Sequence, residues 1–147
     1  MLSLTSLNTN GGVGGLDHGF GRTQAAVHLD RLVLDGLVKI MGSSHSHEGP
    51  VDAIWKAIKE AVGSEESQDW VLEKYVVDQK MNCGRGTTSG VTKVRILAGP
   101  ERNKRQRFWG ESLVSDTNVA AALAMLNAIN RFLALSDSEK RTEPVVV

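Results

Sequence analysis

The apolar residues of this 147-residue chain follow three strand-type patterns and then one helical pattern, and the second half repeats that order. The strand-type patterns occupy residues 2–9, 23–29 and 32–41 in the first half, and 72–81, 91–97 and 104–109 in the second. A three-stranded sheet with one helix leaves apolar surface uncovered, so two such units are expected to pack together. The repeat predicts an α+β fold of two βββα units related by pseudo-two-fold symmetry. We expect the helices to pack between or against three-stranded antiparallel sheets, and the whole to form a dimer.

The two helical patterns are expected at residues 50–62 and from about Asp116 to Leu135. In the first, the apolar residues form one helix face, Gly49-Pro50 suits a helix start, and Gly63 suits a stop. These apolar residues are Val51, Ile54, Trp55, Ile58 and Val62. The second is rich in alanine, which favours helix and gives a slim profile, so we expect it to be buried against a partner. Its predicted apolar stripe is Val119, Ala122, Leu123, Leu126, Asn130 and Leu133.

The length suits one domain, which we assign to residues 1–135, with a first unit at 1–63 and a second at 64–135. Residues 136–147 are polar and are expected to form a flexible tail. Short loops at 46–49 and 110–114 are expected to lead into the two helices. Glycine-rich turns are expected at 84–90 and 99–103.

The charge and cysteine content argue against several classes of protein. There are 17 basic and 17 acidic residues, and this zero formal charge argues against a nucleic-acid partner. The single cysteine excludes an intrachain disulfide framework and favours a reducing compartment. Neither a bilayer-spanning apolar run nor a secretory signal is recognised in the pattern, so we expect a cytoplasmic protein without a membrane partner.

Each half of the chain contains a distinctive motif. Gly49-Pro-Val-Asp-Ala53 opens the first predicted helix, and Leu72-Glu-Lys-Tyr75 begins the strand after it. In the second half, Gly110 and Asp116 precede a helix that contains the run from Ala124 to Arg131. These motifs resemble the Gly-Pro-Val-Asp-Ala helix start, the Leu-x-x-Tyr and the Ala-x-x-Ala-x-Asn-Arg helix end of the carboxy-terminal regulatory domain of α-isopropylmalate synthases and citramalate synthases. The resemblance covers about residues 2–135. His47 and Ser112 stand where the family usually has glycine.

The resemblance implies a regulatory domain that is not itself an enzyme and needs no cofactor. The parent enzyme would be an acyltransferase whose metal-dependent barrel condenses acetyl-CoA with a 2-oxo acid. Its regulatory domain would form a homodimer and bind leucine, the end product of isopropylmalate synthases, for feedback inhibition. The alternatives are isoleucine, as in citramalate synthases, or a dimerisation module that has lost its effector, which His47 and Ser112 favour. The expected partners are a second copy, the effector and the catalytic barrel.

A free amino acid has groups that this chain can match. Its carboxylate suits the amides and dipole of a helix start, at Gly49–Asp52 or near Asp116. The ammonium suits Asp52 or Asp116, and the branched side chain suits apolar residues. The predicted effector-binding residues are Gly49, Pro50, Val51, Asp52, Leu72, Tyr75, Val114 and Asp116. Helix capping by the two aspartates and plain core packing by the apolar residues are the competing interpretations. Leu72 and Tyr75 share a face only if the strand is twisted or bulged between them.

Three other segments were considered as sites. His45 and His47 are two ligands at most, which is a weak metal signal, so no metal site is predicted. Residues 102–107 are basic and could contact nucleic acid, although a solvated strand edge is the stronger interpretation. The segment 84–90 lacks the Lys-Ser/Thr ending of a phosphate loop. No convincing set of catalytic residues was found.

Overall fold

The computed structural model describes residues 1–11, 23–63, 68–84 and 87–142 and contains the predicted repeat. Its elements are β1 (Leu2–Gly11), β2 (Thr23–Val33), β3 (Gly36–Ser46), α1 (Pro50–Val62), β4 (Trp70–Gly84), β5 (Thr87–Pro100), β6 (Phe108–Val114) and α3 (Thr117–Thr142). Two antiparallel sheets form, with strand orders β1-β2-β3 and β4-β5-β6. The α+β class and the two βββα units are therefore confirmed.

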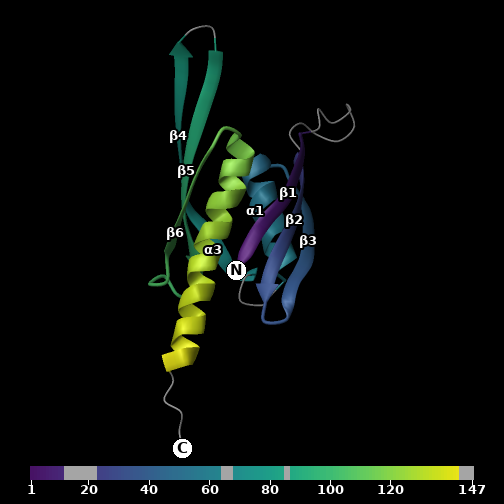
Figure 1. Cartoon of the computed structure of the whole chain (residues 1–147), viewed down its shortest axis with the longest axis vertical. Helices are drawn as coiled ribbons and strands as arrows, with labels where there is room; N and C mark the ends of the chain where they lie inside the picture. Colours follow the sequence, from purple (N-terminus) through teal and green to yellow (C-terminus); the bar gives the residue numbers. More distant parts are fainter. Residues whose placement is uncertain (12–22, 64–67, 85–86, 143–147) are drawn as a thin grey trace, which may run out of the picture.

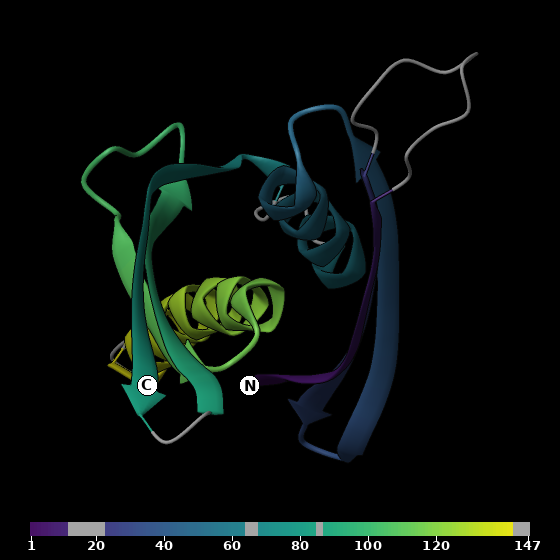
Figure 2. The same ribbon diagram turned by 90° about the horizontal axis from the view of Figure 1, so that it is seen from above.

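The two helices lie between the two sheets, which face each other across them (Figures 1 and 2). α1 packs on β2 and β3, α3 packs on β5 and β6, and the helices contact each other. Each central strand turns alternate residues towards this shared core, as a half-buried strand should. The buried positions are Thr23, Ala25, Val27 and Leu29 on β2, and Thr92, Val94, Ile96 and Ala98 on β5.

The two units repeat one another down to their irregularities. The first strand of each has a register shift against the central strand, between Leu4 and Ser6 in β1 and between Leu72 and Lys74 in β4. Each such bulge adds one residue and lets residues on either side of it face the same way. The matching bulges indicate that the two units share backbone geometry as well as the order of their elements.

A glycine in the third strand of each unit lets the helix approach the sheet closely. A Cβ atom on Gly42 would overlap the carbonyl of Ala57 and the amide of Ala61 in α1. A Cβ atom on Gly110 would overlap the carbonyl of Ala124 and the amide of Ala128 in α3. Both helices thus place an Ala-x-x-x-Ala pair against a bare strand backbone, and this spacing puts the two alanines on one helix face.

The predicted third strand, at 32–41, is wrong in position. Val33 pairs with Gly36, so the chain turns at Leu34 and Asp35, inside the predicted strand. Gly36 has φ 133°, a backbone conformation that suits glycine. Asp35-Gly36 is a typical hairpin-turn sequence. The strand was misplaced because apolar residues on both sides of this pair continue the strand-type pattern.

The predicted sixth strand, at 104–109, is also misplaced, because residues 104–107 form a loop and β6 begins at Phe108. Arg107 closes this loop by donating to the carbonyls of Pro100 (2.9 Å), Asn103 (3.1 Å) and Gln106 (3.0 Å). Its Nε also donates to Glu73 at 2.5 Å. Residues 110–114, predicted as a loop, belong to β6 instead.

α3 differs from prediction in length and in its buried surface. It continues past Leu135 to Thr142, and residues 143–147 of the predicted tail lie outside the described part. Its buried residues surround more of the helix than the predicted stripe: Ala120, Ala121, Ala122, Ala124, Met125, Leu126, Ala128 and Ile129. Over Thr117–Leu135 it is long and apolar enough to cross a membrane by length and composition, yet 44% of its most apolar window is buried inside this fold.

Side chains from the helices join the two units. The Asn130 amide on α3 accepts from the Leu2 amide at 2.7 Å and donates to the Leu2 carbonyl at 2.8 Å. Lys59 on α1 lies over the Trp55 ring and donates to the carbonyl of Trp70 at 3.4 Å. Burial lowers the pKa of the Lys59 ammonium, and the attraction of Asp52 only partly opposes this shift. These contacts fix the first strand of each unit to a helix.

We expect Gly42→Val and Gly110→Val each to destabilise the fold by about 1–3 kcal/mol or more, since the new side chain must displace a helix backbone. Ser43→Val is the matched control, because Ser43 is exposed on the neighbouring position of β3. Urea unfolding followed by circular dichroism gives the free energies. Equal stability of Gly42→Val and Ser43→Val would contradict the close approach.

We expect Asn130→Leu to lower the free energy of unfolding by about 2–3 kcal/mol, because it removes two hydrogen bonds and leaves part-buried groups of Leu2 unpaired. Asn127→Leu is the control, since Asn127 is exposed and donates once, to the Glu111 carbonyl. Its cost should stay below about 1 kcal/mol. The same unfolding measurement decides, and similar costs for both variants would rule out this role for Asn130.

Candidate effector site

The first turn of α1 begins without a side-chain cap. Gly49 is the N-cap residue with φ 108°, and Pro50 follows as the first helical residue. The Ala53 amide bonds to the Gly49 carbonyl at 3.2 Å, which leaves the amides of Val51 and Asp52 without a partner in the helix. Such amides, together with the helix dipole, favour a bound anion.

Asp52 lies in this turn and is held by two neighbours. The buried Ser46 hydroxyl donates to its carboxylate at 2.5 Å and accepts from the Glu48 amide at 3.0 Å. The Lys56 ammonium lies 2.9 Å from the same carboxylate oxygen. Burial by itself would raise the pKa of Asp52, but the bonds from Ser46 and Lys56 outweigh it and lower that pKa below the ordinary 3.8. Asp52 is therefore a carboxylate at neutral pH.

The start of α3 differs, because Asp116 caps it. The Asp116 carboxylate accepts from the amides of Asn118 (2.8 Å) and Val119 (3.1 Å). Its own carbonyl accepts from Ala120 at 2.9 Å. Asp116 therefore acts as a helix cap, which is the competing interpretation of its role as an effector-binding residue. The two helix starts therefore offer different chemistry: open amides at α1 and an exposed, partly satisfied carboxylate at α3.

Leu72 and Tyr75 face the same side of β4, because the register shift between Leu72 and Lys74 places a bulge there. They pair with the buried residues Ala98 and Ile96, and both are partly buried against the core. Burial raises the pKa of the Tyr75 phenol, which keeps it protonated at neutral pH. Leu72 and Tyr75 thus share a face of the strand because of the bulge, as the sequence analysis required.

The predicted site residues do not all lie together in one chain. α1 and α3 begin at the same end of the molecule (Figure 1), so Gly49–Asp52 lie towards the same end as Val114 and Asp116. Leu72 is two residues after Trp70, whose carbonyl accepts from Lys59 in the last turn of α1. Leu72 therefore follows a residue bonded to the end of α1, whereas Gly49–Asp52 form the beginning of that helix.

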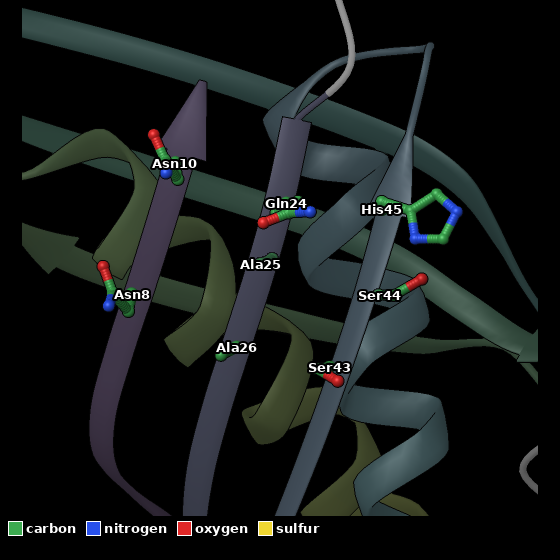
Figure 3. A pocket seen from close by; sticks show the side chains of 8 residues that line it. All are labelled: Asn8, Asn10, Gln24, Ala25, Ala26, Ser43, Ser44 and His45. Carbon is green, nitrogen blue, oxygen red and sulfur yellow. The ribbon is translucent and has the colours of Figure 1, made fainter. Parts of the chain in front are cut away.

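Two hollows in the described part of the chain are lined by other residues. One, of about 480 Å³, lies over the sheet β1-β2-β3 (Figure 3), and the other, of about 560 Å³, lies beside Met1 and α3. In Figure 3, Asn8, Gln24 and His45 come from three different strands, and His45 points away from the asparagines. Neither hollow is lined by a predicted effector-binding residue.

The other two candidate segments, the histidine pair and the basic run, do not form a recognisable site among the described residues. Among the described residues, no three His, Cys, Asp or Glu side chains group as a metal site. In the basic segment, Arg107 closes a loop, and Arg102 lies 3.6 Å from Asp69. Sequence reasoning missed Ser46 and Lys56 as partners of Asp52. The i,i+4 spacing of Asp52 and Lys56 was a usable signal, whereas the contact with Ser46 depends on the fold.

Because folding lowers the pKa of Asp52, its ion pair and hydrogen bond stabilise the fold above the unfolded pKa of 3.8. This stability, about 1 kcal/mol, should disappear as the pH falls through the folded pKa. We expect wild type to exceed Asp52→Asn in free energy of unfolding at pH 7 and to match it at low pH.

Ser46→Ala should raise the pKa of Asp52, measured by NMR titration. An unchanged pKa would contradict the role of Ser46.

The sequence from residue 23 to residue 133 matches the family described as the LeuA allosteric (dimerisation) domain. The match runs from the start of β2 into α3, and it includes the start of α1 and the capped start of α3 but not β1. It confirms the resemblance drawn from the motifs and agrees with the duplicated fold. The chain therefore belongs to the LeuA allosteric (dimerisation) domain family, a regulatory and dimerising module rather than a catalytic one.

Proposed function

We propose that this chain is the leucine-sensing regulatory domain of a 2-isopropylmalate synthase, and that the effector binds at the first turn of α1. The open first turn is the observation that carries the proposal, because α3 begins with a cap and α1 does not. An effector carboxylate would accept from the amides of Val51 and Asp52. The parent enzyme would be the acyltransferase, and this domain would respond to its end product.

The other groups of the amino acid fit the same end of the molecule. Asp52 carries a negative charge at neutral pH and can accept from an ammonium. Asp116 is a second carboxylate at that end, although it already accepts two amides. Val51 and Val114 are partly buried and supply apolar surface for a branched side chain. Leu72 and Tyr75 remain predictions from the resemblance, since they lie on β4 in the other sheet.

A dimerisation module without an effector is the second candidate, favoured by His47 and Ser112 in place of glycine. The Ser112 hydroxyl donates to the Ala120 carbonyl and is thus bonded within the second unit. His47 is exposed. Neither side chain occupies the first turn of α1, which supports retention of the effector over its loss. Isoleucine, as in citramalate synthases, is the alternative effector.

Leucine at a hundred times its dissociation constant should stabilise the chain by about 2.7 kcal/mol, seen as a rise in melting temperature. Isothermal titration with leucine and isoleucine identifies the effector. Isopentylamine, which is leucine without its carboxylate, should not bind, because it cannot use the α1 amides. If neither amino acid binds, the dimerisation module is the correct assignment.

Two matched variants test the ammonium partner. Asp52→Asn should weaken binding at least about tenfold, since a hydrogen bond to a charged group contributes about 1.5–3 kcal/mol. Asp116→Asn should leave affinity nearly unchanged and keep the helix cap, because asparagine caps as well as aspartate. The reverse result would assign the ammonium to Asp116.

A further inference from the structure

We propose that the Lys56 ammonium competes with the ammonium of the effector for the Asp52 carboxylate, so that Lys56 limits the affinity of the site. The inference rests on the proposed function and adds to it the residue that determines how tightly the ammonium is held. It starts from the donors that surround the Asp52 carboxylate.

One oxygen of the Asp52 carboxylate, Oδ2, accepts from two donors. The Ser46 hydroxyl lies 2.5 Å from this oxygen, and the Lys56 ammonium lies 2.9 Å from it. A carboxylate oxygen has two lone pairs, so these two donors fill it. An effector ammonium must therefore either replace one donor at Oδ2 or bind at Oδ1, beside the positive charge of Lys56. Replacement breaks an ion pair, and neighbouring ammonium groups repel each other, so Lys56 opposes binding in both cases.

Lys56 is the donor that can leave. Ser46 is buried, and its hydroxyl also accepts from the Glu48 amide at 3.0 Å, which fixes it at the end of β3. The Lys56 side chain is 48% exposed, and its ammonium is carried by a flexible four-carbon stem. Ion pairs at such positions are weak, because water screens them and holding a long side chain costs entropy. An effector ammonium would therefore displace Lys56 and leave Ser46 in place.

The surrounding charges favour this exchange. The hydrogen bond and charge of Asp52 raise the pKa of the Lys56 ammonium, and the charge of Glu48, in the loop before α1, adds to this. A displaced Lys56 would therefore remain near a second carboxylate. Lys59 also feels the charge of Asp52, but its ammonium donates to the Trp70 carbonyl at 3.4 Å. The effector has an advantage over Lys56, because its carboxylate also binds the open amides of the first turn.

Three variants, each titrated calorimetrically with leucine and isoleucine, test the competition. Lys56→Met removes the charge and keeps a good helix former, and it should lower the dissociation constant of the effector about threefold. Lys56→Arg keeps the charge and pairs with carboxylates at least as well, so its dissociation constant should equal or exceed that of wild type. Lys39→Met is the matched control. Lys39 is an exposed lysine opposite Asp30 on β3, and its removal should leave the dissociation constant unchanged.

A second ligand and an NMR titration separate competition from a general effect of charge. 4-Methylpentanoate, which is leucine without its ammonium, does not compete with Lys56, so Lys56→Met should not bind it more tightly than wild type does. In wild type, saturating leucine should lower the pKa of Lys56, because the lysine loses its pair or gains a like charge beside it.

The outcomes distinguish this inference from the proposed function. If wild type binds the amino acid but Lys56→Met binds it no more tightly, or if the pKa of Lys56 stays unchanged on binding, the competition is refuted and the effector site stands. An equal gain for 4-methylpentanoate refutes it as well. If neither leucine nor isoleucine binds wild type, the proposed function itself is wrong, and the inference is wrong with it.

Discussion

The fold depends on the close contact between each helix and the bare backbone of the third strand in its unit. Gly42 and Gly110 supply the bare positions, and Ala57–Ala61 and Ala124–Ala128 supply the slim helix faces. This contact brings two helices and two sheets into one shared core. It also sets each helix start relative to the end of the preceding strand. In the first unit, that placement brings the Ser46 hydroxyl to Asp52 and orders the turn proposed to receive the effector.

The two βββα units are alike in their core positions and differ at their helix starts and hairpins. Inward-facing positions of β2 and β5 are buried alike, whereas the helix starts and hairpins differ. α1 starts with Gly49 and Pro50 and has no side-chain cap, and α3 starts with the capping Asp116. In the second unit, β4 and β5 continue pairing beyond the last pair between β5 and β6.

The sequence predicted what local patterns determine and missed what the tertiary fold determines. The bounds of α1 were correct because periodicity, Pro50 and Gly63 all agree. The third strand was misplaced because apolar residues run through the turn at Leu34 and Asp35. The sixth was misplaced because Arg107, although polar like a strand-edge residue, closes a loop through three carbonyls. The sequence showed that Leu72 and Tyr75 could share a face only with a twist or bulge between them. Alternation alone could not show where that bulge lies.

The position of Leu72 limits how an effector site can be built. Trp70, two residues before it, bonds to Lys59 in the last turn of α1, whereas the open amides of Val51 and Asp52 lie in the first turn. Leu72 itself pairs with the buried Ala98 and packs against the core. Its contact with an effector therefore rests on the resemblance, while the open amides at the start of α1 are a feature of the fold.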